Sequence, residues 1–129
     1  MWTVDFSPDG KLLAAGGQTG KVMIWDAETK VEHRSLSGHQ HSVTTVSFGP
    51  GGKLLASGSD DDTIKLWSMV SGESLKTLTG HAGNVNCVAF SPKGATISSC
   101  SDDKTIKEWD VASGEELRTL TGHTNSVER

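Results

Sequence analysis

The sequence has 129 residues, with 12 Lys and Arg against 16 Asp and Glu, and a formal net charge of −4 at pH 7. A chain of this length and acidic balance ordinarily forms one domain and leaves no basic stripe for phosphates, so we expect no nucleic-acid partner. No apolar run approaches the ~18 residues that a membrane helix needs, and no signal peptide is expected. These features predict a cytoplasmic protein with no membrane partner.

The sequence consists of one unit written three times at a constant period, equal to the step from Trp25 to Trp67 and again from Trp67 to Trp109. Two further landmarks share this period, namely a Gly-His pair and a four-residue turn that begins at Ser7, Gly49 and Ser91. The Gly-His pairs contain His39, His81 and His123. A repeat of this length predicts structural units that stack on one another.

Each unit is predicted to form four short strands separated by turns. In chain order, the first unit has strands near Val4 and Phe6 and over 12–17, 22–25 and 32–36. The second has strands over 43–48, 54–59, 63–67 and 73–79, and the third over 85–90, 96–101, 105–109 and 115–120. Alternating apolar residues, β-branched runs and closely spaced turns are typical of antiparallel meanders. The prediction is an all-β chain of three four-stranded sheets.

These motifs resemble the WD-repeat (WD40) family of β-propellers. The resemblance rests on Gly-His near the start of a unit, the Ser-Pro-Asp-Gly turn, Ser-x-Ser-x-Asp and the closing dipeptides Trp25-Asp26 and Trp109-Asp110, which the middle unit replaces by Trp67-Ser68. It implies blades packed face to face around a central channel, and a protein-binding role rather than chemistry. We divide the chain into blade one (1–38), blade two (39–80), blade three (81–122) and the start of a further blade (123–129).

The resemblance also implies a buried hydrogen-bonded set in each complete blade. The expected sets are His39, Ser57, Asp61 and Trp67 in blade two, and His81, Ser99, Asp103 and Trp109 in blade three. His, Ser and Asp together also suggest a hydrolase triad, which we keep as an alternative. A catalytic triad occurs once and faces a pocket, whereas this set recurs, so we expect a structural role and no catalytic residue.

Cysteine and histidine spacing gives no reason to expect a cofactor or a metal. Cys87 and Cys100 are well separated in the sequence and form no Cys-x-x-Cys motif, so we expect two reduced thiols in packed strands. His39 and His41 lie close together in the sequence, but no third ligand is nearby.

The first and third units depart from the common pattern. Blade one has Ala15 and Thr19 at the Ser and Asp positions, so Trp25 is expected to have no set, and His123 belongs to a set whose blade is not in the sequence. In blade three, Glu108 stands where the other units have Ile24 and Leu66. We expect that face of blade three to be more exposed to water, as in a terminal repeat; equal burial of Glu108 and Leu66 would contradict this.

Three blades leave two broad faces uncovered, one of which is expected to carry Leu13 and Trp25. Three arrangements stay open: part of a longer propeller, a ring closed by two or three copies, or an open wedge. We favour the first, because Met1 replaces the valine found at Val43, Val85 and Val127.

The resemblance places partner binding on loops and strand starts at the narrow face of the blades. The matching residues are Trp2, Gln18, Ser42, Thr44, Asp60, Asn84, Asn86 and Asp102. Trp2 is notable because exposed indoles are enriched in interfaces. Asp60 and Asp102 make this rim acidic, which favours a protein partner with a basic segment.

Overall fold

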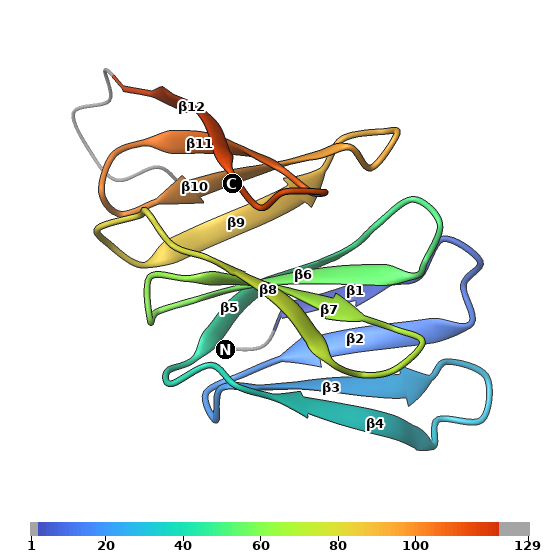
Figure 1. Ribbon diagram of the computed structural model, residues 1–129. Coiled ribbons are helices and arrows are strands. Elements are labelled where there is room, and N and C mark those ends of the chain that lie inside the picture. Colours follow the sequence, from blue (N-terminus) through green and yellow to red (C-terminus); the bar gives the residue numbers. More distant parts are fainter. Residues whose placement is uncertain (1–2, 122–129) are drawn as a thin grey trace.

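The computed structural model describes residues 3–121, which form twelve strands in three four-stranded antiparallel sheets (Figure 1). Blade one contains β1 (Thr3–Phe6), β2 (Leu12–Gly16), β3 (Lys21–Asp26) and β4 (Glu32–Ser37). Blade two contains β5 (Val43–Phe48), β6 (Leu54–Ser59), β7 (Ile64–Ser68) and β8 (Ser74–Leu78). Blade three contains β9 (Val85–Phe90), β10 (Thr96–Ser101), β11 (Ile106–Asp110) and β12 (Glu116–Leu120). The predicted all-β fold with three meander sheets is confirmed.

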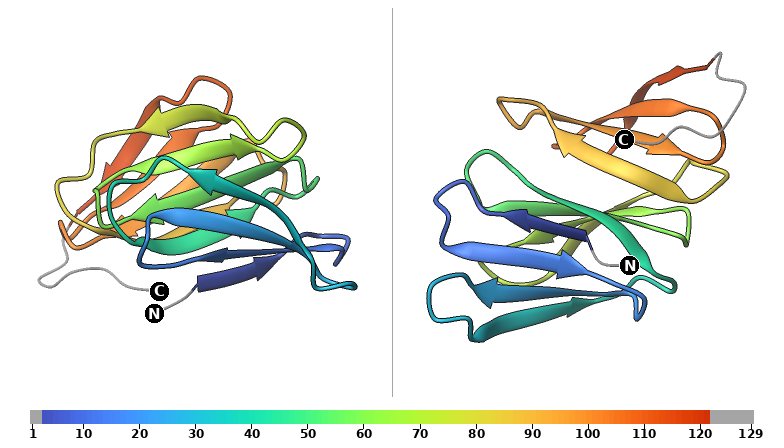
Figure 2. Two further views of the ribbon diagram at one scale, coloured as in Figure 1. Left: turned by 90° about the horizontal axis from the view of Figure 1, so that it is seen from below. Right: turned by 180° about the vertical axis from the view of Figure 1, so that it is seen from behind.

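Residues 3–121 contain no helix, and therefore none long and apolar enough to cross a bilayer. In each sheet the strands follow chain order, so every strand pairs with its sequence neighbours within the same sheet. The three sheets lie one above another, with the first strands β1, β5 and β9 close together and the last strands β4, β8 and β12 farther apart (Figures 1 and 2). This is an open series of blades.

The recurring turn between the first two strands of a blade follows from its residues. In blade one the Ser7 hydroxyl donates to the Asp9 carboxylate at 2.6 Å, and the Lys11 amide donates to the same oxygen at 2.9 Å. Gly10 has a φ of 73°, a left-handed conformation that glycine adopts without steric cost, and Gly52 and Gly94 repeat it. The turn therefore needs its fourth residue to be glycine.

Each blade has two faces, which we name by their residues. The tryptophan face carries an aliphatic residue, an aromatic residue, a second aliphatic residue and tryptophan; these are Val4, Phe6, Leu13 and Trp25 in blade one, and their equivalents in the next two repeats. The opposite face carries Leu12, Ala14, Val22, Ile24 and Leu36 in blade one, and their equivalents in the other blades. Side chains alternate between the two faces because successive residues of a strand point to opposite sides.

The hydrophobic core lies between blades. One cluster joins the opposite face of blade one to the tryptophan face of blade two and contains Ala14, Val22, Ile24, Leu36, Val43, Val46, Phe48, Leu55 and Trp67. The second joins blades two and three in the same way and contains Ala56, Ile64, Leu66, Leu78, Val85, Val88, Ile97 and Trp109. Each sheet is therefore stabilised by burying a face against the next sheet.

The opposite face of blade three and the tryptophan face of blade one are more exposed than the faces buried between blades, as expected. Glu108 leaves 30% of its side chain exposed, whereas Leu66, at the same position of blade two, is 2% exposed. On blade one, Leu13 and Trp25 are half-buried and Phe6 is exposed.

The expectation of two free thiols is wrong. Cys87 and Cys100 form a disulfide with an S–S distance of 2.06 Å and a Cα–Cα distance of 5.2 Å. They are directly paired residues of β9 and β10, a register that their spacing in the sequence alone does not reveal. Thr45 and Gly58 occupy the same pair of positions in blade two.

Candidate functional site

The structure brings together the four side chains expected to form a set in blade two. His39 precedes β5, Ser57 lies in β6, Asp61 lies in the β6–β7 turn, and Trp67 lies in β7. His39 Nδ1 lies 2.9 Å from Asp61 Oδ2, and His39 Nε2 lies 2.7 Å from Ser57 Oγ. The Trp67 indole N–H donates to Ser57 Oγ at 2.8 Å. The set connects two strands, a turn and the segment that enters the blade.

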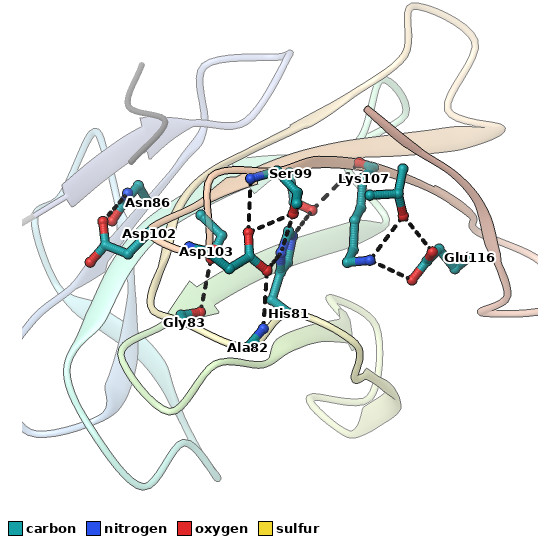
Figure 3. Close-up of polar contacts among 12 residues, drawn as sticks. His81, Ala82, Gly83, Asn86, Ser99, Asp102, Asp103, Lys107 and Glu116 are labelled. Atoms are coloured by element: carbon teal, nitrogen blue, oxygen red, sulfur yellow. Dashed lines mark hydrogen bonds and ion pairs between the residues drawn. The ribbon is translucent and has the colours of Figure 1, made fainter. Parts of the chain in front are cut away.

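Blade three repeats this geometry (Figure 3). His81 Nδ1 lies 2.9 Å from Asp103 Oδ2, and His81 Nε2 lies 2.7 Å from Ser99 Oγ. The Trp109 indole N–H donates to Ser99 Oγ at 2.9 Å. We call the interface between two neighbouring blades a joint. Both tryptophans are 2% exposed, so each indole N–H is hydrogen-bonded inside a packed joint.

The hydrogen bonds assign the protons of each set. An ionised carboxylate can only accept, so His39 Nδ1–H donates to Asp61 and Nε2 is left as an acceptor. Ser57 then donates its hydroxyl proton to Nε2 while accepting the indole N–H of Trp67. Burial lowers the pKa of His39, against the hydrogen bond from its ring to Asp61, and this favours the neutral imidazole.

The two aspartates are held in the ionised form. Burial alone would raise the pKa of Asp61, but hydrogen bonds from Thr63, His39 and the Gln40 amide outweigh it and lower the pKa to about 2. Burial also opposes the shift at Asp103, where hydrogen bonds from Thr105, His81 and the Ala82 amide lower the pKa further.

Ser–His–Asp geometry in these sets does not amount to a catalytic site. Ser57 is 0% exposed and Ser99 is 1% exposed, so neither hydroxyl can meet a substrate. Each serine oxygen also accepts an indole N–H, which engages the lone pair that a nucleophile would use. No set of three His, Cys, Asp or Glu side chains within residues 3–121 is placed to hold a metal. The arrangement is suited to holding strands and loops together.

A threonine that the sequence reasoning missed completes each set. Thr63 Oγ1 donates to Asp61 Oδ1 at 2.5 Å, and its amide donates to the same oxygen at 2.9 Å. Thr105 repeats both contacts with Asp103. The signal was present in the sequence, because Asp-x-Thr recurs at the same place in the following repeat.

Blade one has no equivalent set within the described residues. Ala15 occupies the place of Ser57, and Trp25 is half-buried rather than sealed in a joint. His123 lies outside residues 3–121.

The predicted rim residues lie at one end of the blades, on the first strands and on the turns between the second and third strands. Ser42, Thr44, Asn84 and Asn86 flank or begin β5 and β9, whereas Gln18, Asp60 and Asp102 lie in the three turns. Trp2 lies outside the described residues.

Hydrogen bonds join several rim residues in pairs. The Asn86 side-chain amide donates to Asp102 Oδ1 at 2.8 Å, and the Asp102 amide donates to the Asn84 carbonyl at 2.9 Å (Figure 3 shows the first). The Asp60 amide donates to the Ser42 carbonyl at 3.0 Å. The rim is thus a hydrogen-bonded surface in which Gln18 and Asp102 are exposed.

Thr44 is the rim residue that also belongs to a joint. Its hydroxyl donates to the Gly58 carbonyl at 3.3 Å within blade two and contacts the Val85 carbonyl of blade three. We infer that this side chain supports packing between blades two and three.

Comparisons with known proteins agree with this architecture. The family model "WD domain, G-beta repeat" matches residues 1–26, 30–68 and 72–110. A 44-residue stretch, 34% of the chain, is 41% identical to the periodic tryptophan protein 2 homolog of Dictyostelium discoideum, of which it covers 5%. A structure of U3-55K superposes with a TM-score of 0.93 at 27% identity, over 97% of this chain and 40% of that one.

A crystal structure of RRP9 WD40 repeats superposes equally well, with a TM-score of 0.93 and 28% identity over 97% of this chain and 39% of that one. The chain therefore spans well under half of the length of these solved structures. The repeats, the blades and the matched family model together show that the chain belongs to the WD40 repeat family.

Proposed function

We propose that the chain is a non-enzymatic scaffold that binds other proteins through the acidic rim. The observation that carries this proposal is the division of polar residues between two environments. The Ser–His–Asp–Trp sets are buried and repeated, so they are committed to structure. The rim residues Gln18 and Asp102 are exposed and Asp60 is half-buried, so they are open to a partner.

The charge of the rim favours a partner with lysine or arginine side chains. Asp60 and Asp102 occupy equivalent turns of neighbouring blades, and each follows a fully buried serine at the end of a strand. These two carboxylates attract basic segments of a partner toward the rim and favour basic partners over acidic ones. The family match and the solved relatives support a protein-binding role of this kind.

A matched pair of double variants tests the proposal. Asp60→Asn with Asp102→Asn removes two rim charges, whereas Glu73→Gln with Glu115→Gln removes two charges from exposed residues at the other end of the strands. Binding of a synthetic peptide of alternating lysine and serine is measured by fluorescence anisotropy. We expect the rim variant to bind severalfold more weakly and the control to bind like the unmodified chain. Equal weakening by both variants would contradict a rim-specific site.

A further inference from the structure

The two joints inside the chain show what a blade requires of its neighbour. In each joint a tryptophan face covers an opposite face made of five apolar positions, which are occupied by Leu12, Ala14, Val22, Ile24 and Leu36 in blade one and by Leu54, Ala56, Ile64, Leu66 and Leu78 in blade two. Ala, Val, Ile and Leu at the last four positions are no more than 2% exposed in either joint. These four positions are therefore almost free of water, and none of them carries a charge.

The tryptophan face of blade one has the residues of such a joint, but nothing within residues 3–121 covers it. Val4 and Phe6 are each 58% exposed, whereas their equivalents Val46 and Phe48 are 6% and 7% exposed. Phe6, Leu13 and Trp25 line a shallow pocket of about 280 Å³ on this face, together with Asp26, Ala27 and Lys30. The residue types match those of the covered faces, so only the cover differs.

The opposite face of blade three does not offer that cover. Thr96, Ser98 and Glu108 replace leucine, alanine and the aliphatic residue found at Ile24 and Leu66. Glu108 Oε1 lies 3.6 Å from Arg118 Nε, and both side chains are partly exposed. Docking this face onto blade one would place a carboxylate at the position where the two inner joints bury Ile24 and Leu66, and removing that charge from water is costly.

Blade three also fails to meet a second requirement of the joint, which is a glycine in its second strand. A Cβ added at Gly16 would lie 2.4 Å from Val43 Cγ1, and one added at Gly58 would lie 2.6 Å from Val85 Cγ1. Glycine is therefore needed at this position for the first strand of the next blade to approach closely. In blade three the position is Cys100, whose side chain is linked to Cys87.

The first joint also contains a hydrogen bond between blades. The Phe48 amide of blade two donates to the Asp5 carboxylate of blade one at 2.8 Å. The equivalent residue is Ser47 in blade two and Ala89 in blade three, so a joint forms with or without a carboxylate at this position.

From these differences we propose that the tryptophan face of blade one receives a blade that presents leucine, alanine, glycine and an aliphatic residue at the positions of Leu54, Ala56, Gly58 and Leu66. Blade three lacks all four, so the open face of blade three in a second copy is not the occupant, and copies of this chain do not join head to tail. The inference concerns the flat faces of the blades and is independent of the rim proposed to bind partners. It selects against ring closure by identical chains.

The test builds the proposed occupant onto blade three. A graft variant carries Thr96→Leu, Ser98→Ala, Cys100→Gly, Glu108→Leu and Cys87→Thr, which restores the residues of blade two. Sedimentation velocity is measured over a range of concentrations for the unmodified chain and for the graft. We expect the unmodified chain to sediment as a monomer and the graft to form dimers or larger assemblies. Adding Phe6→Asp to the graft should return it to a monomer, because Phe6 lines the receiving face.

Two results would overturn the proposal. One is an unmodified chain that self-associates and loses this association with Phe6→Asp, because a second copy would then occupy the face. The other is a folded graft, as judged by circular dichroism, that stays monomeric. If the graft does not fold, a smaller graft of Glu108→Leu with Cys87→Thr and Cys100→Gly replaces it, since it removes both the charge and the blocking side chain. We expect a smaller shift toward assemblies for this smaller graft, and no shift would contradict the proposal.

Discussion

Blades one and two have the same strands in the same register, yet of these two only blade two has a hydrogen-bonded set among residues 3–121. Leu13 pairs with Trp25 as Leu55 pairs with Trp67, and the paired position that holds Ser57 in blade two holds Ala15 in blade one. The meander therefore forms without the set. What the set adds is attachment of the segment at His39 and of the β6–β7 turn to the strands behind them.

The largest expected effect separates the two tryptophans. Trp67 is 2% exposed and fills the joint between blades one and two, whereas Trp25 is half-buried on an open face. We expect Trp67→Ala to lower the free energy of unfolding by ~3–5 kcal/mol, a range typical of large buried side chains. Trp25→Ala should cost markedly less. Urea denaturation followed by circular dichroism measures both, and equal losses would mean that the two faces are equally covered.

The disulfide gives the next largest effect. Blade three has this bond, whereas blade one has Thr3 and Gly16 at the same positions. Closing a loop of this length contributes up to ~3 kcal/mol, so we expect Cys87→Ser with Cys100→Ser to lower the free energy of unfolding by ~2–3 kcal/mol in the same assay. Alkylation of the purified chain without reductant should label neither cysteine, and labelling of both would contradict the bond.

Removing the histidine of a set should have an intermediate effect. His39→Ala and His81→Ala each remove one buried hydrogen-bond partner from a serine and one from an aspartate, and we expect losses of ~1–3 kcal/mol. The control is His41→Ala, an exposed histidine close to His39 in the sequence, which should change stability by less than ~0.5 kcal/mol. A loss at His41 as large as that at His39 would count against the set.

The sets should also make stability depend on pH. The pKa of His39 is lowered in the folded chain, so the unfolded chain binds more protons and stability falls as the pH drops below about 6.5. The pKa of Asp61 is lowered to about 2, so its contribution is present above about pH 4 and is lost as the pH falls toward 2. Urea midpoints between neutral and acid pH measure this. His39→Ala should flatten the part of the curve near pH 6, and an unchanged slope would contradict the assignment.

The smallest expected effect concerns the turns between second and third strands. Lys104 has a φ of 70°, where blade one has Gly20 with a φ of 79°. Because this conformation costs a non-glycine residue ~1–2 kcal/mol and glycine loses ~0.5–1 kcal/mol in chain entropy, Lys104→Gly should raise stability by up to ~1 kcal/mol. Gly20→Ala should lower it, since the added Cβ would lie 2.5 Å from the His39 carbonyl oxygen. Thermal unfolding measures both shifts, and a destabilised Lys104→Gly variant would contradict this strain argument.

Sequence periodicity predicted most of the fold because one unit, read three times, repeats its turns and apolar positions. The strands β6, β7, β10 and β11 begin and end close to the predicted ranges. The side chains of the sets were implied by the resemblance to the WD-repeat family, and the fixed offsets of histidine, serine, aspartate and tryptophan in two repeats located them in this sequence.

Features that depend on register were not predictable in the same way. The Cys87–Cys100 bond follows from how β9 and β10 pair, and a spacing in sequence does not determine pairing across a turn of variable length. The contact between Thr44 and the Val85 carbonyl likewise depends on how two blades sit together. The glycine requirement at Gly16 and Gly58 became visible only with the valines of the next blade in place.

Adjacent blades cover one another in this fold. Nuclear Overhauser effects in the unmodified chain test this packing directly. We predict cross-peaks between the Val43 methyl groups and the Hα protons of Gly16, and between the Val85 methyl groups and those of Gly58, because each valine packs against the glycine of the preceding blade. These contacts link residues of different sheets and cannot arise within one meander. A well-dispersed spectrum that shows the contacts within sheets but lacks both of these cross-peaks would contradict the stacked arrangement.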